Sequence, residues 1–283
     1  MPPLDRRADN RSTLHFCITH KELDIPLQDH LILLEIGDRG SVPSAGGNKV
    51  INCYDELPGA RVHRKKLGAM LGVFAARHYL CRAFEELDFS VSLSTYRTCM
   101  MHERNEENFM TGIQMNLVTP EQASRLTGKM IQPDTSSKWL LPQPITVPSV
   151  GAQYAKAHHL EDLEVYLSIA IEENVLADHE LTPFLESKTL LPGCFGVSLM
   201  PAQVFCDVGE KLERVANRFL EGFSVSNRDS YQIRAVDFCS ERLGSFLIAK
   251  HLTRVYGTLP KEFFGYWTRV SADLVCTSGH MSD

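Results

Sequence analysis

The chain has 283 residues, of which 43% are hydrophobic and 23% are charged, a composition typical of a globular protein. At this length about three quarters of the unfolded chain's surface can be buried, so the core needs no disulfide or structural metal. The net charge of −6, from 29 basic and 35 acidic residues, argues against a protein whose main surface binds nucleic acid.

The spacing of the cysteines indicates a reducing compartment, and the lengths of the apolar runs argue against a membrane span or a secretion signal. The eight cysteines occur singly, with no CxxC pair, so we expect free thiols and no zinc ribbon. No apolar run approaches the ~18–20 residues that cross a bilayer, and the start of the chain has no apolar signal core. We therefore predict a cytoplasmic protein whose segment 1–13 is flexible.

Two basic clusters, RRADNR at 6–11 and HRKK at 63–66, each admit two interpretations. Such a cluster is either a solvated surface or a contact for a phosphate or an acidic head group. The second interpretation leaves open a peripheral contact with the inner face of a membrane.

Two short apolar runs of β-type composition come first, LHFCIT at 14–19 and LILLEIG at 31–37, and each ends in a polar loop. Two such strands predict the start of an α/β sheet. In open α/β sheets, ligands bind beyond the carboxyl ends of the strands. The segments that this rule places next to a ligand are THK at 19–21 and GDRG at 37–40.

The next segments alternate between helical and strand patterns. Residues 65–87 have the apolar spacing of a core-facing helix, and residues 89–100 alternate as a strand does, with a polar STYR where the apolar part stops. Residues 119–128 are predicted to be helical. WLLP at 139–142 is predicted to be a short strand that its proline ends.

The C-terminal half is predicted to be mainly helical. An amphipathic helix is expected to begin at AHHLEDL, residues 157–163, so that this motif occupies its first turns. A buried strand is predicted over 190–200, a helix over 201–222 and a further helix over 231–252. Apolar periodicity is weak in the segment 258–283, which is predicted to be a C-terminal extension with a mobile end.

These landmarks, in this order, resemble a bacterial glycosyltransferase family known as domain of unknown function 4422, found in capsule and O-antigen gene clusters. The resemblance runs from about residue 14 to residue 252. THKELDIP and LEIG are similar to its opening, and VSLSTYRTCM to its strand ending in H-Y-R-R. The more specific matches are YAKAHHLEDL, to its Y-x-x-A-H-H-x-E-D-L segment, and DSYQIRAVDFCSERL, to its S-x-Y-Q-x-R…F-x-S-E-R-L helix.

The amino-terminal half departs from this family in two places. Family members carry a C-E-L/I-T-x-x-Y-W-x-W-K-N helix, whereas here the helix reads KKLGAMLGVFAARHYL, without the carboxylate or the tryptophans. Thr95 and Thr98 replace the histidine and the second arginine of H-Y-R-R. Because of these departures, the exact donor cannot be carried over from the family to this chain.

The resemblance implies a fold and an activity. The fold is α/β, of the GT-A-like nucleotide-sugar-binding type, with a mixed central sheet flanked by helices and one glycosyltransferase domain over 14–257. The activity is that of a hexosyltransferase, moving a sugar from a nucleotide-sugar donor, foremost a UDP-sugar, to a glycan or lipid-linked acceptor in surface polysaccharide synthesis. Galactose, or its furanose form, is the donor sugar that it suggests.

The nucleotide-sugar site is expected beyond the first strand and beyond the strand that ends at Thr95-Tyr96-Arg97, where many transferases of this fold hold a metal with a D-x-D pair. No acidic pair stands there. The planar guanidinium group of arginine suits phosphate oxygens. Arg97, with Lys21 or Arg64, is therefore expected to stabilise the departing diphosphate directly, and we predict a metal-independent mechanism. Divalent metal such as Mn²⁺ is the alternative. The cofactor-binding residues predicted in this way are Thr19, His20, Lys21, Gly37, Tyr96 and Arg97.

The AHHLEDL segment is predicted to contribute catalytic groups. On a helix, His158 and Asp162 share a face at i, i+4, and an imidazole held by a carboxylate is suited to binding a sugar hydroxyl. Glu241, a carboxylate in an apolar helix, is the other candidate base. The alternatives are a plain helix start for the acidic pair, a metal site at His158, His159 and Asp162, and a structural pair of Glu241 with Arg242 or Arg234.

The predicted site therefore has a catalytic part and a substrate-binding part. The catalytic residues are His158, Asp162 and Glu241, and the substrate-binding residues are His159, Glu161, Gln232 and Arg242. Two other classes of function stay open: a non-catalytic sugar- or nucleotide-binding protein that retains the fold, and a metal-dependent hydrolase that uses the His/Asp cluster. The oligomeric state is not predicted.

Overall fold

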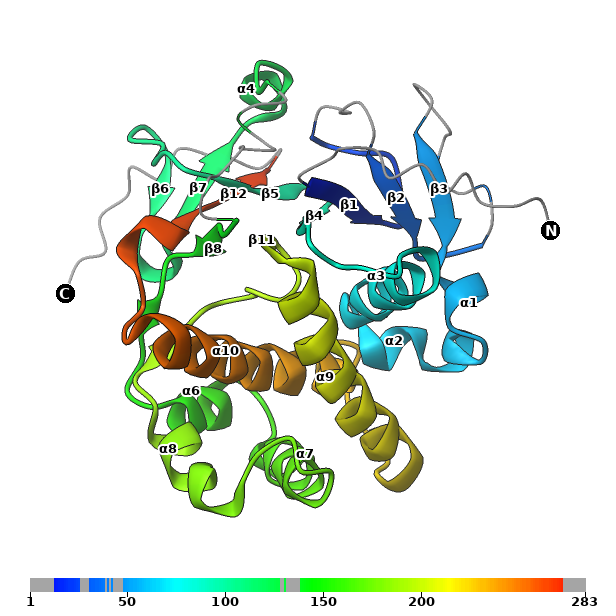
Figure 1. The fold of residues 1–283 in the computed structure, drawn as a ribbon, viewed down its shortest axis with the longest axis vertical. Coiled ribbons are helices and arrows are strands. Elements are labelled where there is room, and N and C mark those ends of the chain that lie inside the picture. Colours follow the sequence, from blue (N-terminus) through cyan, green and yellow to red (C-terminus); the bar gives the residue numbers. More distant parts are fainter. Residues whose placement is uncertain are drawn as a thin grey trace.

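A central mixed sheet with helices packed mainly on one side forms the computed structural model of the chain, which describes residues 13–25, 31–38, 40, 42, 48–127, 130 and 138–271 (Figure 1). Ten described strands form this sheet, in the order β3-β2-β1-β4-β5-β12-β7-β6, with β11 beside β4 and β8 beside β12. A second sheet of two strands pairs β9 with β10. The prediction of a mixed central sheet flanked by helices is confirmed.

The amino-terminal half builds four parallel strands in the order β3-β2-β1-β4. The register pairs Thr19 with Glu35 and Ile18 with Thr95, so the carboxyl ends of β1, β2 and β4 lie at one edge of the sheet. Parallel strands require crossover connections, and α1, α2 and α3 supply the crossover from β3 to β4. The elements are β1 (Thr13–Thr19), β2 (Ile32–Glu35), β3 (Lys49–Asn52), α1 (Cys53–Glu56), α2 (Arg64–Leu67), α3 (Met70–Ala83) and β4 (Ser90–Thr95).

The other half of the sheet is mixed. The last strand, β12, lies between β5, to which it is antiparallel, and β7, to which it is parallel. These strands are β5 (Thr98–Met101), β6 (Phe109–Met110), β7 (Met115–Val118), β8 (Leu141–Pro142), β9 (Ile145–Thr146), β10 (Thr189–Leu190), β11 (Ser198–Pro201) and β12 (Phe264–Val270).

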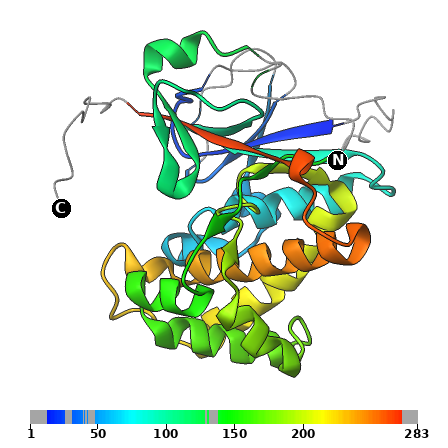
Figure 2. The same ribbon diagram turned by 90° about the vertical axis from the view of Figure 1, so that its left-hand side faces the viewer.

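Most helices form one layer beneath the sheet, and α4 lies on its opposite side (Figure 2). The remaining helices are α4 (Pro120–Ser124), α6 (Val150–Ala157), α7 (Leu160–Glu172), α8 (Leu181–Glu186), α9 (Ala202–Gly222) and α10 (Ala235–Tyr256). Short 3₁₀ turns occupy Ala60–His63, Thr111–Ile113, Asp178–Glu180, Gln232–Arg234 and Lys261–Phe263.

Strand alternation explains why both faces of the sheet are apolar. Phe16 and Ile18 of β1 point into the main core, which also contains the apolar faces of α3, α9 and α10. Cys17, between them, points to the other face and packs in a smaller core with Leu33 and with Ala123 of α4. Successive side chains of a strand alternate between faces, so one apolar run serves both layers.

The expected helix over 65–87 is interrupted. Gly68 separates α2 from α3 and has a φ of +54°, a left-handed value that an L side chain rarely adopts. The side chain of Asp237, on α10, lies where a Cβ of residue 68 would stand. The break therefore lets α10 approach the start of α3.

The expected strand over 89–100 is a hairpin. β4 ends at Thr95 and β5 begins at Thr98, which pairs with Thr95 in antiparallel register. Tyr96 and Arg97 thus form the tight turn between two strands. The apolar alternation correctly predicted strand structure on both sides of residues 96–97, but it did not predict that the chain reverses direction there.

The C-terminal boundary at residue 257 differs from the structure. The segment 258–283 was predicted to be an extension, yet residues 264–270 form β12, an inner strand of the sheet. The domain therefore continues to Val270 at least. The predicted flexible segment 1–13 and the predicted mobile end of the chain lie, apart from Thr13 and Ser271, outside the described residues.

Candidate functional site

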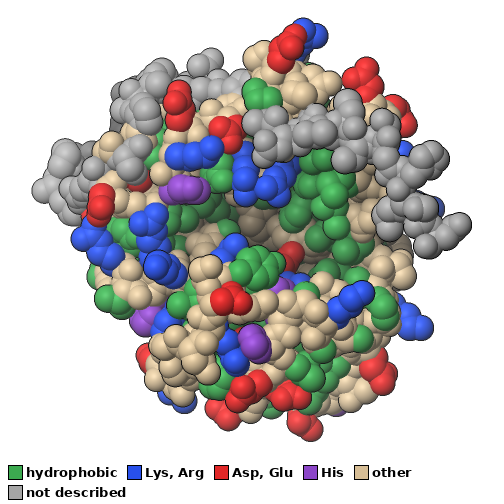
Figure 3. Space-filling model, turned by 180° about the vertical axis from the view of Figure 1, so that it is seen from behind, with side chains coloured by type: hydrophobic (Ala, Val, Ile, Leu, Met, Phe, Trp, Pro, Cys, Tyr) green, Lys and Arg blue, Asp and Glu red, His purple; other side chains and the backbone are tan. Residues whose placement is uncertain are grey.

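A cleft of about 660 Å³ opens at the carboxyl ends of β1 and β4. From β1 the chain adds β2 and β3 on one side, and then crosses back to place β4 on the other side of β1. Such a reversal of strand order leaves a crevice between the two strand ends, which is where α/β sheets bind ligands. On the face shown in Figure 3, Lys and Arg side chains stand around a central hollow.

His20 and Tyr96 meet at this strand reversal. Each residue directly follows its strand, and their rings pack edge to face with centroids 4.9 Å apart. The Tyr96 amide donates to the Ile18 carbonyl at 3.0 Å, which fixes the β4–β5 turn against the end of β1. Lys21 and Arg97 approach the Tyr96 ring at 4.7 and 5.2 Å, so the turn carries positive charge.

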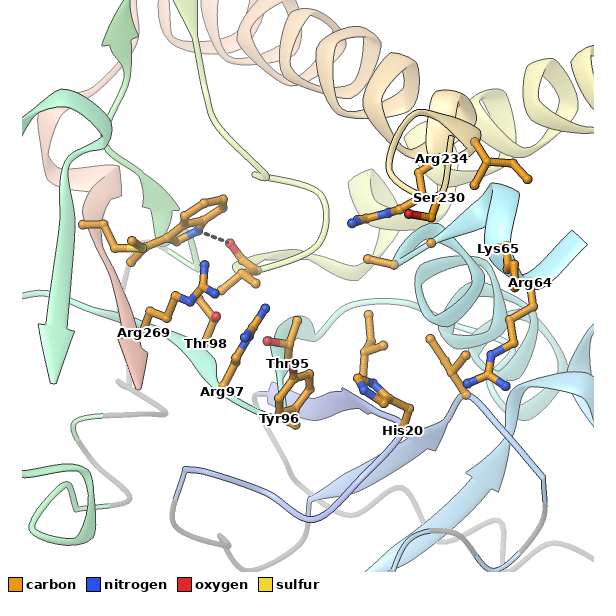
Figure 4. Close-up of a pocket in the computed structure, with 18 of the residues that line it drawn as sticks. His20, Arg64, Lys65, Thr95, Tyr96, Arg97, Thr98, Ser230, Arg234 and Arg269 are labelled. Atoms are coloured by element: carbon orange, nitrogen blue, oxygen red, sulfur yellow. Dashed lines mark hydrogen bonds between the residues drawn. The ribbon is translucent and has the colours of Figure 1, made fainter. Parts of the chain in front are cut away.

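Basic side chains dominate the lining of the cleft. Asp229 is the one carboxylate among the described lining residues. Figure 4 shows Arg97 and Arg269 together at one end, with His20, Arg64 and Lys65 toward the other and Arg234 across the cavity. The basic lining residues are His20, Arg64, Lys65, Arg97, Arg228, Arg234 and Arg269.

These cations divide into paired and unpaired ones. Arg228 and Arg234 form ion pairs, with Asp162 and with Asp237. Within the described ranges, no carboxylate lies within 4.0 Å of Arg64, Lys65, Arg97 or Arg269. Four positive charges thus face one cavity without an anionic partner in the described part of the chain, an arrangement that favours an anionic ligand.

The pKa values of two cleft groups are lowered, first by burial and then by the neighbouring cations. Partial burial, together with Arg64, Lys21 and Arg97, lowers the pKa of His20. Partial burial and the neighbouring Arg97 likewise lower the pKa of Arg269. Burial of a cationic group and positive charge beside it both lower its pKa, so the two effects act in the same direction here.

Asp162 is fully buried and lies behind the cleft wall. Its Oδ1 accepts a hydrogen bond from Arg228 Nη2 at 2.8 Å, and the exposed Glu161 lies 3.3 Å from the same nitrogen. Arg228 in turn lines the cleft. The predicted catalytic residue Asp162 and the predicted substrate-binding residue Glu161 therefore do not line the cleft themselves, but both contact Arg228, which does.

His158 does not belong to the helix in which it was predicted. It ends α6 in an extended conformation, with φ −142° and ψ 177°, and α7 begins only at Leu160. His158 and Asp162 therefore do not share one face of a single helix. Instead the His158 ring stacks on Phe238 with centroids 4.0 Å apart, and its Nδ1 lies 3.1 Å from Oε1 of Gln232. Burial lowers the pKa of His158.

Glu241 and Arg242 form the structural pair that was one of the alternatives. Glu241 Oε2 accepts from Arg242 at 2.8 Å, and Glu241 Oε1 accepts from the amide of Gly193 at 2.8 Å. Arg242 also donates to Gln153 at 3.1 Å. Neither residue lines the cleft.

The remaining predicted residues do not line the cleft. Thr19 is buried, and its hydroxyl bonds to the backbone of Lys21. Lys21 forms an exposed ion pair with Asp24 at 3.1 Å, and the Gly37 carbonyl accepts from Asn52 at 3.1 Å. The exposed His159 precedes α7. Of the predicted cofactor-binding set, the cleft lining contains His20, Tyr96 and Arg97.

The cleft also contains residues that the sequence reasoning missed. Arg228 and Asp229 come from the loop before α10, and Trp267 and Arg269 come from β12. The Asp229 carboxylate accepts from the amides of Tyr231 and Gln232, both at 2.8 Å, which lowers its pKa. The available signal was the alternation of YWTRV, in which Trp267 and Arg269 fall on one face of a strand.

The described residues give no sign of a metal cluster or of a membrane span. They contain no group of three or more His, Cys, Asp or Glu side chains arranged to hold a metal ion. Within the same ranges, no helix combines the length and the apolar character that a bilayer crossing requires.

The fold is similar to that of a known glycosyltransferase. An apo structure of WbbM, a bifunctional glycosyltransferase, superposes with a TM-score of 0.69 and 14% sequence identity. The match covers 92% of this chain and 45% of that one, so this chain spans less than half of the other. No family model matches the chain, and no curated protein matches its sequence.

Proposed function

We propose that this protein is a glycosyltransferase that moves a sugar from a nucleotide-sugar donor to a glycan or lipid-linked acceptor in surface polysaccharide synthesis. The observation that carries the proposal is the set of four cations, Arg64, Lys65, Arg97 and Arg269, that have no carboxylate partner among the described residues and line a cleft at the reversal of strand order. A fold similar to that of a bifunctional glycosyltransferase and the matches of AHHLEDL and SERL to the resembled family support it.

In this proposal the donor's diphosphate lies between the two walls of the cleft. Arg64 and Lys65 approach it from α2, and Arg97 approaches it from the β4–β5 turn. Ile18 and Ile36 offer apolar contact for the nucleoside beside His20. A UDP-sugar, with galactose or galactofuranose, is the donor that the resemblance favours.

The arginines would replace a metal as the stabiliser of the leaving group. In glycosyl transfer the bond from the anomeric carbon to the diphosphate breaks, and negative charge develops on the departing oxygen. Preorganised cations directed at such an oxygen lower the barrier, and guanidinium groups bind phosphate oxygens in a bidentate manner. Activity is then expected to survive EDTA; loss in EDTA with recovery in Mn²⁺ would contradict this mechanism.

We propose that Asp229, the one carboxylate among the described residues that line the cleft, is the general base for the acceptor hydroxyl. A bond forms between the acceptor oxygen and the anomeric carbon, and Asp229 takes the hydroxyl proton. Asp162 then serves to hold Arg228, Glu241 holds the loop at Gly193, and His158 holds Gln232. Asp229→Asn keeps an oxygen for the two backbone amides and removes the base, so turnover should fall about 10²–10⁴-fold.

A thermal-shift experiment with UDP-galactose tests the donor. A ligand at ~100 times its dissociation constant adds ~2.7 kcal/mol of stability. Arg64→Gln and Arg97→Gln should reduce the shift, whereas Arg254→Gln, on the exposed end of α10, should retain it. If neither UDP-galactose nor another nucleotide sugar stabilises the folded protein, the proposal is wrong.

The second candidate is a non-catalytic sugar- or nucleotide-binding protein. The observation that favours it is that Asp229, the one carboxylate among the described residues that line the cleft, already caps a turn through its Oδ1. Such a protein would bind UDP-galactose, lose that binding in Arg97→Gln, and neither transfer nor hydrolyse the sugar. Turnover that Asp229→Asn abolishes would decide for the enzyme.

A further inference from the structure

Strand β12 contributes a second, chemically different end to the cleft. Trp267 and Arg269 lie two residues apart and both line the cleft, whereas Thr268, between them, lines a separate cavity of about 310 Å³. This alternation follows from the geometry of a strand. Met115 and Val197 lie beside Trp267 in the lining, so this end combines an aromatic ring, apolar contacts and one cation.

The Trp267 ring is held in a fixed position. Gly193 has a φ of +57°, and a side chain at this position would overlap Cζ2 of Trp267, so the loop backbone packs directly against the indole. Trp267 Nε1 points at the Val197 carbonyl, 3.5 Å away. Glu241 accepts the Gly193 amide at 2.8 Å and so anchors this loop to α10. A half-buried, immobile aromatic face is suited to stacking against a sugar ring.

Arg269 is tied to the β4–β5 turn and remains without a carboxylate partner in the described residues. The Val270 amide donates to the Arg97 carbonyl at 2.9 Å, so the two arginines enter the cleft side by side (Figure 4). A nucleotide-sugar diphosphate carries two negative charges. Arg64, Lys65 and Arg97 already exceed that charge, so Arg269 is available to a second anion.

We propose that the β12 end of the cleft is the acceptor subsite and that it takes a sugar bearing a carboxylate or phosphate group, with the ring on Trp267 and the anionic group on Arg269. This inference rests on the proposed transferase function, because it places the acceptor relative to the donor. It adds a chemical class of acceptor, an acidic sugar or a phosphorylated one, to that function.

Intrinsic fluorescence tests the subsite because the chain has two tryptophans and the other, Trp139, is buried. The protein is titrated with methyl β-glucuronide, with galactose 6-phosphate and with neutral methyl β-galactoside, with and without UDP-galactose. We expect at least one of the two acidic probes to have a dissociation constant about ten-fold or more below that of the neutral probe. The reason is that hydrogen bonds to a charged group are stronger than those between neutral groups. The tighter of the two identifies a carboxylate or a phosphate.

Variants assign the binding to the two side chains. Trp267→Phe should remove the fluorescence change, and Arg269→Gln should weaken the acidic probe about ten-fold or more without affecting the neutral one. Arg254→Gln, which removes the same charge far along α10, should leave both unchanged. Near-ultraviolet circular dichroism checks that each variant is folded.

Two outcomes overturn the inference. One is equal binding, or no binding at millimolar concentration, of acidic and neutral probes. The other is an Arg269→Gln variant that weakens UDP-galactose and leaves the acidic probe unaffected, which would assign Arg269 to the donor while the transferase proposal stands. Conversely, acidic-probe binding that depends on Arg269, without any response to nucleotide sugars, supports the anion subsite and contradicts the proposed donor.

Discussion

Asp162 shows how burial decides the role of a carboxylate. Its side chain is 1% exposed and its Oδ1 bonds to a guanidinium whose side chain is 11% exposed. A buried carboxylate that is committed to an ion pair has no path to a substrate proton, but it fixes its partner in one orientation. Arg228 lines the cleft, so Asp162 can influence a ligand through the position of that arginine.

Asp162→Asn should lower the free energy of unfolding by about 2–3 kcal/mol, because it leaves the Arg228 charge without its closest partner. Glu161→Gln is the matched control. It removes the neighbouring charge, 3.3 Å from the same nitrogen, from a side chain that is 66% exposed, and should cost at most about 1 kcal/mol. Urea denaturation measures both. Equal losses would show that the buried pair is not the stabilising one.

His20 should make donor binding depend on pH. Its pKa in the free protein is lowered, by partial burial and by Arg64, Lys21 and Arg97, and a bound diphosphate raises it again by neutralising those cations. A group whose pKa rises on binding takes up a proton, so affinity increases as pH falls toward and below 6.5, the ordinary value for histidine.

The measurement is a titration with UDP-galactose between about pH 5 and pH 8. The diphosphate diester does not titrate in this range, so the protein supplies the change. His20→Gln should bind with an affinity that no longer varies with pH. A pH dependence that survives in this variant would assign the effect to another group.

At the scale of elements, a buried charge network joins α3 to α9. Glu213 of α9 accepts from Arg77 Nε at 3.0 Å and lies 2.8 Å from His78 Nε2, both on α3. Burial alone would raise the pKa of Glu213, but the hydrogen bonds from His78 and Arg77 outweigh it, and the pKa is lowered below 4.5. The network thus fixes how the two helices pack beneath the sheet.

The sign of this shift sets a pH window for stability. A carboxyl group with a lowered folded-state pKa stabilises the fold above its unfolded pKa, near 4.5, and the contribution is lost as pH falls through the folded value. Glu213→Gln should therefore cost about 2–4 kcal/mol at pH 7. The cost should shrink below pH 4.5; a cost that is the same at pH 7 and about pH 3 would show that packing, not ionisation, is lost.

Local patterns predicted these elements to different degrees. The long helix α9 was predicted to within one residue of its ends and α10 to within four, because their apolar stripes repeat over many turns. The residues 89–100 were predicted as one strand, since alternation looks the same on both sides of a two-residue turn. AHHLEDL was predicted to be wholly helical, whereas the packing of His158 on Phe238 ends α6 there.

The same limit applies to the cleft. His20 was predicted because it directly follows an apolar strand, and α/β sheets bind ligands beyond the carboxyl ends of their strands. Tyr96 and Arg97 were predicted from the resemblance of VSLSTYRTCM to the family's strand that ends in H-Y-R-R. Arg228, Trp267 and Arg269 were not, because their proximity to those strand ends depends on chain topology. The Trp267–Met115 and Arg269–Thr98 pairings join segments more than 150 residues apart, and no local pattern in the sequence encodes them.

At the scale of the whole molecule, a strand from the C-terminal part of the chain completes the central sheet. β12 pairs with β5 on one side and β7 on the other, and its first residues pair with β8. The first half of the sheet is built from strands that are close in sequence, while the second half depends on a strand near the end of the chain. The cleft lies where these two halves meet, so the last strand completes both the fold and the candidate site.

A chain that ends at residue 257 should therefore fail to fold, because it exposes the edges of β5 and β7 and removes Phe263, Phe264 and Val270 from the apolar cores. A chain that ends at Ser271 retains every described strand and should keep a cooperative thermal transition. Circular dichroism and size-exclusion chromatography compare the two. A folded, monodisperse 1–257 chain would mean that the sheet is stable without β12 and would restore the boundary predicted from the sequence.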